Sequence, residues 1–185
     1  MFYFSKEKRN RQMKNLVKQA KLGNKEAFSE LIQLNKVNMY KVARAVLDND
    51  EDVSDAIQDT VLICWEKLDT LNNNQYFKTW MTRILINCCY KIINKNNREL
   101  SHSFTEELVV NDSSIETVEW KNSLEYLEEK YRIMIILYYV QGYKVREIAE
   151  ILDIKETTVK DRLKKAREQY RIKILGERGG RENEL

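Results

Sequence analysis

Apolar residues recur every three or four positions along most of this chain, the spacing at which side chains share one face of an α-helix. The pattern predicts helices over about residues 27–47, 52–68 and 76–92, with a break near Asn35 in the first of them. Proline is absent and only 5 of the 185 residues are glycine, a composition that suits helices joined by short polar turns. The predicted fold class is all-α.

The periodicity fails in the middle of the chain, between about residues 94 and 118, where the sequence is polar and rich in Ser and Asn. Such a composition is typical of a connecting segment. We therefore predict two helical domains, residues 1–98 and 118–176, joined by a flexible linker over residues 99–117. The last segment, residues 177–185, is predicted to be disordered.

The segment VREIAEILDIKETTVKDRLKKAR, residues 145–167, contains two short amphipathic patterns with almost nothing between them. The residues expected to face inward are Val145, Ile148, Ala149, Leu152, Val159, Leu163, Ala166 and Tyr170. Ala149 allows close crossing of two helices, Asp153 tolerates the left-handed backbone of a tight turn, and Ile154 can fill the junction. The second domain is therefore predicted to be a helix-turn-helix.

The outward face of the second of these helices is polar and basic. Its first polar residues could meet base edges in a major groove, while Lys and Arg on its flanks could meet phosphates. A basic helix face taken alone is more often solvated surface, and Asp161 and Glu168 would be repelled by phosphates unless they face bases or solvent. The candidate DNA-binding residues are Lys155, Thr157, Thr158, Lys160, Asp161, Arg162, Lys164 and Lys165.

Charge is sorted along the chain, although the net charge of +3 is too small to indicate nucleic-acid binding by itself. The N-terminal segment is basic, with Lys6, Lys8, Arg9, Arg11, Lys14, Lys18 and Lys21. Residues 48–59 are acidic and contain neither Lys nor Arg. On the helix predicted from about residue 52, the side chains of Asp52, Asp55, Asp59 and Glu66 fall opposite the apolar face. That acidic face is either solvated or an interface for a basic partner.

The segment YFKTWMTRILINCCYK, residues 76–91, places aromatic rings, amides and cations close together. Capture of bases that leave the double-helical stack requires all three kinds of group. Phe77 also recurs with Met81 and Ile84 at helical spacing, which fits a core residue, and Trp80 fits either role. The segment is thus a candidate surface for single-stranded nucleic acid.

Several classes of protein are disfavoured. The longest apolar run, residues 133–140, is too short to span a bilayer, and we expect a cytoplasmic protein. Three cysteines and one histidine indicate neither a disulfide framework nor a metal site. No nucleophile with a base and no phosphate-binding glycine loop is visible, so we expect no enzyme activity, no cofactor and no metal.

Four segments in order resemble the extracytoplasmic-function (ECF) sigma factors, the two-domain specificity subunits of bacterial RNA polymerase. They are LGNKEAFSELI, EDVSDAIQDTVLICWEKLDTL, FKTWMTRILINCCYKIINK and YRIMIILYYVQGYKVREIAEILDIKETTVKDRLKKAR. The resemblance implies docking of core RNA polymerase on Asp52, Asp55, Gln58 and Asp59. It implies recognition and melting of a promoter minus-ten element by Tyr76, Phe77, Lys78, Trp80, Arg83, Asn87 and Lys91, and recognition of a minus-thirty-five element by the helix-turn-helix.

The resemblance also implies a stress or envelope response and control by an anti-sigma factor, usually a membrane-bound one. The chain departs from the family pattern at Glu128, Asp153 and Lys155, where Pro, Gly and Ser are usual, and at Lys91, where an acidic residue is common. Two other interpretations are open at this point. One is a conventional helix-turn-helix regulator that binds duplex DNA without polymerase, and the other is a helical protein that sequesters partners and has no DNA role.

Overall fold

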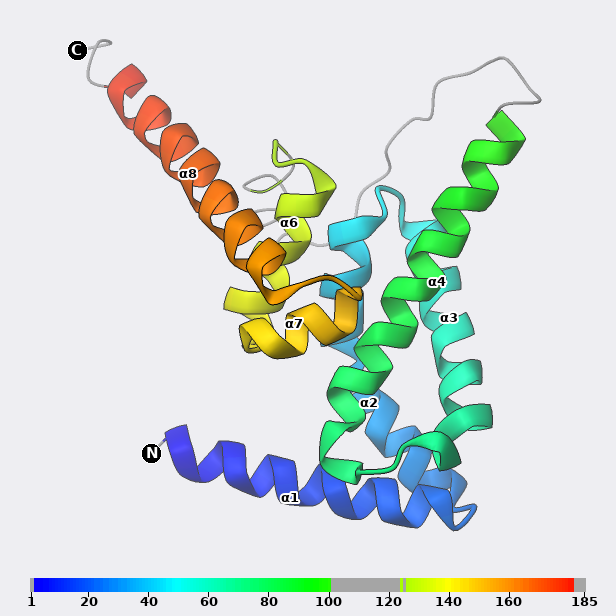
Figure 1. Cartoon of the computed structure of the whole chain (residues 1–185). Coiled ribbons are helices and arrows are strands. Elements are labelled where there is room, and N and C mark those ends of the chain that lie inside the picture. Colours follow the sequence, from blue (N-terminus) through cyan, green and yellow to red (C-terminus); the bar gives the residue numbers. More distant parts are fainter. Residues whose placement is uncertain (1, 101–123, 125, 182–185) are drawn as a thin grey trace. The chain divides into compact units, whose positions relative to one another are not determined.

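The computed structural model of the chain describes residues 2–100, 124 and 126–181, and all regular structure within these ranges is helical (Figure 1). The chain divides into two compact units, residues 1–102 and 103–185. The predicted linker, residues 99–117, lies outside the described residues except for residues 99 and 100, which end a helix.

The first unit contains α1 (Phe2–Lys21), α2 (Lys25–Val46), α3 (Asp50–Lys67) and α4 (Phe77–Leu100). Helices α2, α3 and α4 pack against one another, and α1 packs on α2. Two single 3₁₀ turns, η1 (Leu68–Thr70) and η2 (Asn74–Tyr76), lie between α3 and α4. The largest fully buried side chains of this core are Leu31, Met39, Phe77, Met81, Leu85 and Ile86.

Asparagine side chains cap the N-termini of two of these helices. Asn24 accepts a hydrogen bond of 2.8 Å from the backbone N–H of Ala27 at the start of α2, and Asn49 accepts one of 2.7 Å from that of Asp52 at the start of α3. Such caps satisfy amides that have no partner inside the helix. The predicted break near Asn35 is wrong, because α2 is continuous and the buried Asn35 amide donates to the carbonyl of Leu31 at 2.8 Å.

The second unit contains α6 (Glu129–Ile135), a π-helical turn η3 (Ile136–Val140), α7 (Val145–Leu152) and α8 (Glu156–Arg181). Helices α6 and α7 both pack against α8. Gly142, with φ of 71°, forms the turn after η3, where a left-handed backbone is needed. The core of this unit contains Ile133, Met134, Leu137, Ile148, Val159 and Leu163.

Three helices exceed the predictions. Helix α1 is not among the predicted helices, and α4 continues past residue 94 to Leu100. Helix α8 continues through residues 177–181, so the prediction of disorder over 177–185 is wrong there, and residues 182–185 lie outside the described residues. Apolar periodicity reveals only the helical turns that bury a face. The added turns of α4 and α8 are largely polar, so the sequence pattern gave no sign of them.

Candidate nucleic-acid interface

The turn between α7 and α8 has the predicted geometry. Asp153 adopts the left-handed conformation, with φ of 54° and ψ of 47°, and the backbone N–H of Ile154 donates to the carbonyl of Ala149 at 3.1 Å. The Glu147 carboxylate accepts a hydrogen bond of 2.8 Å from the backbone N–H of Lys144 and so caps the start of α7. The helix-turn-helix is therefore confirmed as a fold element.

The two faces of α8 differ sharply. Val159, Leu163 and Ala166 are buried, whereas Tyr170, which was expected to continue this stripe, is 38% exposed. On α7 the buried residues are Ile148, Ala149 and Ile151, while Val145 and Leu152 are only partly buried. Of the predicted DNA-binding residues, the exposed ones are Lys155, Thr157, Lys160, Asp161, Lys164 and Lys165, and the partly buried ones are Thr158 and Arg162.

A second polar face runs along α4. At about 100° per residue, Trp80, Arg83, Asn87 and Lys91 fall on one side of the helix, opposite its buried residues. Arg83, Asn87 and Lys91 are exposed, and Trp80 is partly buried. The same face therefore unites four residues that the sequence analysis assigned to minus-ten recognition.

The face continues beyond the predicted residues. A groove of about 410 Å³ on the last turns of α4 is lined by Lys91, Asn94, Lys95 and Arg98. Sequence reasoning missed Lys95 and Arg98, although both follow Lys91 at intervals that keep a side chain near the same face of a helix. The cationic surface is thus longer than predicted.

The aromatic residues at the start of α4 have different environments. Phe77 is fully buried, so its assignment to DNA binding is wrong: the ring belongs to the core and presents no surface to a base. Tyr76 is 51% exposed. Trp80 lies 6.0 Å from the Phe77 ring centroid, with an angle of 42° between the planes, so one side of it rests on the core. Lys78 is partly buried.

The acidic face of α3 is solvent-accessible. Asp55, Gln58 and Asp59 are exposed, and Leu62 on the same face has 61% of its surface exposed. The opposite side of the helix is buried through Val53, Ala56, Thr60 and Cys64. The exposed face of α3 therefore carries one apolar side chain among its carboxylates. Sequence analysis missed Leu62.

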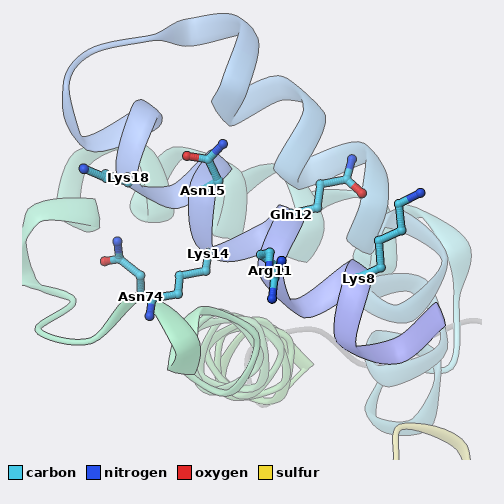
Figure 2. A pocket seen from close by; sticks show the side chains of 7 residues that line it. All are labelled: Lys8, Arg11, Gln12, Lys14, Asn15, Lys18 and Asn74. Carbon is cyan, nitrogen blue, oxygen red and sulfur yellow. The ribbon is translucent and has the colours of Figure 1, made fainter. Parts of the chain in front are cut away.

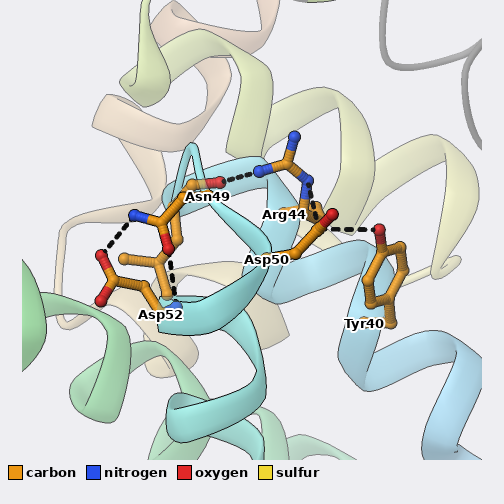
Figure 3. A network of polar contacts seen from close by, with 6 residues as sticks. Tyr40, Arg44, Asn49, Asp50 and Asp52 are labelled. Carbon is orange, nitrogen blue, oxygen red and sulfur yellow. Dashed lines mark hydrogen bonds and ion pairs between the residues drawn. The ribbon is translucent and has the colours of Figure 1, made fainter. Parts of the chain in front are cut away.

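Asp52 differs from the other predicted polymerase-binding residues because its carboxylate is engaged within the unit. It accepts a hydrogen bond of 2.7 Å from the Asn49 side chain (Figure 3). It also accepts one of 3.0 Å from the side chain of Asn96 on α4. Asp52 is also only partly exposed. Its carboxylate joins the start of α3 to α4, which is a structural role.

On the other side of the same turn, Asp50 holds α3 to α2. The Tyr40 hydroxyl donates to its carboxylate at 3.2 Å, and the buried Arg44 guanidinium lies 3.7 Å away (Figure 3). Arg44 also donates to the backbone carbonyl of Leu47 at 2.9 Å. These contacts fix where α3 begins, so its exposed carboxylates keep their place relative to the core.

The three cysteines are buried and form no disulfide, and all lie in the first unit. Burial, aided by the neighbouring Cys88, raises the pKa of Cys64 to about 12. Burial also raises the pKa of Cys88. Such thiols are protonated and unreactive at neutral pH. Among the described residues, no cluster of His, Cys, Asp or Glu could hold a metal ion.

Two family models match this chain. One, sigma-70 region 2, matches residues 31–99, and the other, sigma-70 region 4, matches residues 118–169. The first spans the α2–α4 bundle and the second the helix-turn-helix, so the chain has the two parts of a sigma factor of the sigma-70 class. Its relatives place it among the ECF RNA polymerase sigma factors, and the chain belongs to this family.

The similarity extends over most of the chain. It is 26% identical to the ECF RNA polymerase sigma factor SigW of Bacillus subtilis over 180 residues, covering 88% of this chain and 96% of that protein. It is 25% identical to the ECF RNA polymerase sigma factor SigM of Mycobacterium tuberculosis over 157 residues, covering 83% and 80%.

Solved structures have the same fold. CnrH in complex with the cytosolic domain of CnrY aligns with a TM-score of 0.67 and 24% identity over 89% of this chain and 98% of that one. The sigma factor RpoE in complex with the anti-sigma factor NepR from Bartonella quintana aligns with a TM-score of 0.67 and 26% identity over 77% and 93%. None of the helices within the described ranges is long and apolar enough to cross a membrane.

Proposed function

We propose that this sigma factor uses three separate faces for its three tasks: α3 for core polymerase, α4 for the minus-ten element and α8 for the minus-thirty-five element. The observation that carries the proposal is that each of these helices buries one side and leaves the opposite side polar and exposed. The charges match the proposed partners. Helices α4 and α8 carry cations that suit DNA, and α3 carries carboxylates that suit a basic surface of core polymerase. The protein is proposed to act in the cytoplasm without catalysis of its own.

In the second unit, the exposed start of α8 would enter the major groove. Thr157 and Asp161 lie in the first turns, which face base edges in helix-turn-helix complexes. Lys160, Lys164 and Lys165 flank them and suit phosphate contacts. We assign to this unit the proposed limits 118–176, which the region 4 match over residues 118–169 supports.

In the first unit, the exposed ring of Tyr76 and the free side of Trp80 offer stacking surfaces for bases released from the duplex. Arg83, Asn87 and Lys91 extend along the same helix and suit the strand's phosphates and base edges. Phe77 supports this surface from below rather than contacting DNA. The proposed unit limits, 1–98, include the region 2 match over residues 31–99 except its last residue.

Core polymerase would bind the face formed by Asp55, Gln58, Asp59 and Leu62. Carboxylates at the rim steer a basic partner, and an apolar residue among them can supply buried contact area. Asp52 contributes indirectly, since its carboxylate already joins α3 to α4. Asp55→Lys is therefore expected to weaken core binding by about 10-fold or more while leaving helicity unchanged.

The test is run-off transcription with bacterial core polymerase on a library of promoter fragments, with and without the protein. Transcripts that require both the protein and particular promoter sequences are expected. At a protein concentration that limits transcription, Asp55→Lys should strongly reduce them, and Asp69→Lys, the same charge change at an exposed position outside α3, should not. No transcripts together with tight binding of the free protein to a duplex would replace this proposal with a conventional regulator.

We further propose that an anti-sigma factor, membrane-bound as is usual in the family, holds this protein inactive until a stress or envelope signal releases it. The RpoE–NepR complex, which aligns over 77% of this chain at 26% identity, supports such a partner. Affinity purification from the source cells should recover a protein that competes with core polymerase. Failure to recover a protein that blocks core binding and inhibits transcription would count against control by an anti-sigma factor.

A further inference from the structure

A basic groove in the first unit is not used by any of the three faces above. It has a volume of about 590 Å³ and lies between α1 and the η2 turn (Figure 2). Its lining includes four cations from α1, namely Lys8, Arg11, Lys14 and Lys18, together with Asn74 from η2. We propose that this groove binds the sugar-phosphate backbone of single-stranded DNA next to the bases captured at the start of α4.

Helix α1 is held firmly enough to form one wall of such a groove. Its other side buries Leu16, Val17 and Ala20. Polar contacts add to this packing: Arg9 donates to the Leu34 carbonyl at 3.0 Å, Gln12 donates to Glu30 at 2.8 Å, and Lys21 donates to the Leu71 carbonyl. The last contact ties the end of α1 to the loop that carries η2.

The four cations form a row suited to a polyanion. They follow one another at intervals of three, three and four residues, which corresponds to about 4.5–6 Å along the helix axis. All four are exposed, and no carboxylate lines the groove. Among the described side chains, none of the four is paired with an acidic residue. A row of several such cations is better suited to a chain of successive phosphates than to one isolated anion.

The position of the groove indicates which polyanion it takes. Asn74 is in its wall, and the half-exposed Tyr76 follows two residues later in the same 3₁₀ turn. A base stacked on Tyr76 would therefore leave its neighbouring phosphates beside Asn74 and the α1 cations. This combination of aromatic platform and cationic channel is typical of single-strand binding. The inference rests on the proposed minus-ten role of the first unit.

The experiment measures binding of the full-length protein, assembled with core polymerase, to fluorescent single-stranded oligonucleotides that carry the minus-ten sequence found by run-off transcription. One variant combines Arg11→Gln, Lys14→Gln and Lys18→Gln. The matched control combines Lys25→Gln, Lys36→Gln and Lys67→Gln, which removes the same charge at exposed positions outside the groove. The groove variant should bind about 10-fold more weakly, with a salt slope reduced by about 2, since each phosphate contact on a single strand contributes about 0.7.

Oligonucleotides lengthened by four nucleotides on either side of the minus-ten sequence locate the contact. Wild type should gain affinity from one of the two extensions, and the groove variant should lose that gain. Equal binding by variant and wild type would overturn the groove while leaving minus-ten capture intact. No strand binding by wild type would overturn both proposals. The same variants are also tested on vesicles with anionic headgroups and on duplex DNA. If the groove variant lost binding only to the vesicles, or only to the duplex, and kept its affinity for the single strand, the proposal of a single-strand groove would be overturned.

Discussion

The two units of this sigma factor build their proposed DNA surfaces in different ways. In the second unit the surface is the outward face of one helix, α8, whose exposed residues lie within residues 155–165. In the first unit the surface combines the η2 turn with α4, and the proposed groove adds α1, more than fifty residues away in the chain. A contiguous surface depends on one helix and its support, whereas an assembled surface depends on the contacts that hold several elements together.

The largest expected effect comes from removing support under α8. Ile148 on α7 is fully buried, and Ile148→Ala should lower the free energy of unfolding of the second unit by about 2–5 kcal/mol. Chemical denaturation and hydrogen exchange of α7 and α8 would measure this loss. Arg146→Ala, at an exposed position of the same helix, should cost less than about 0.5 kcal/mol. Equal losses in both variants would show that α7 does not support α8 through its buried face.

A smaller effect is expected at the turn that sets the angle between α7 and α8. Asp153 has φ of 54°, which a β-branched residue adopts only under strain. Asp153→Val should therefore cost about 1–2 kcal/mol relative to Asp153→Gly, measured by thermal unfolding. Both variants lose the Asp side chain, so the difference between them reports the backbone alone. Equal thermal stability of the two variants would mean that residue 153 need not adopt the left-handed conformation for the turn to form.

Alkaline pH should distinguish the two units, because all three cysteines lie in the first. The pKa of Cys64 rises from 9.0 to about 12 on folding, so the folded state retains a proton that the unfolded state loses. The stabilisation is fully present below pH 9 and is lost between about pH 9 and pH 12, by on the order of 1 kcal/mol per pH unit.

Hydrogen exchange of α3 and α4 between pH 8 and pH 10, corrected for intrinsic rates, measures this slope. Cys64→Ala should lower the stability of the first unit below pH 9, and the difference from wild type should shrink as the pH rises above 9, because the variant lacks the titrating thiol. An unchanged slope would show that the thiol does not titrate differently in the folded and unfolded states.

The smallest expected effect concerns the link between α3 and α4. Asn96→Ala removes the hydrogen bond to Asp52 and should cost about 0.5–1.5 kcal/mol, measured by urea denaturation of the full chain. Asn94→Ala, at an exposed position of the same helix, is the control. Asn96→Ala also frees the Asp52 carboxylate from its hydrogen bond to α4, and the affinity for core polymerase should therefore change only slightly. Identical stability of the two variants would remove the proposed link between these helices.

The sequence by itself determined the helical fold, the helix-turn-helix and the acidic and basic faces of α3 and α8. Each of these depends on residues a few positions apart, whose relative directions follow from the helical repeat. The left-handed turn at Asp153 was predictable for the same reason. The four segments that resemble ECF sigma factors were also visible without a structure.

Only the tertiary structure decided which side chains of a predicted face remain available. Helical spacing fitted Phe77 to the core but left Trp80 open, and the structure leaves Trp80 partly buried against the Phe77 ring. The Asp52 carboxylate is engaged by Asn96, 44 residues later, which no local pattern indicates. The groove of α1 and η2 likewise requires segments distant in sequence to pack together. Periodicity fixes the direction of a side chain on its own helix, but contacts between helices determine what it meets.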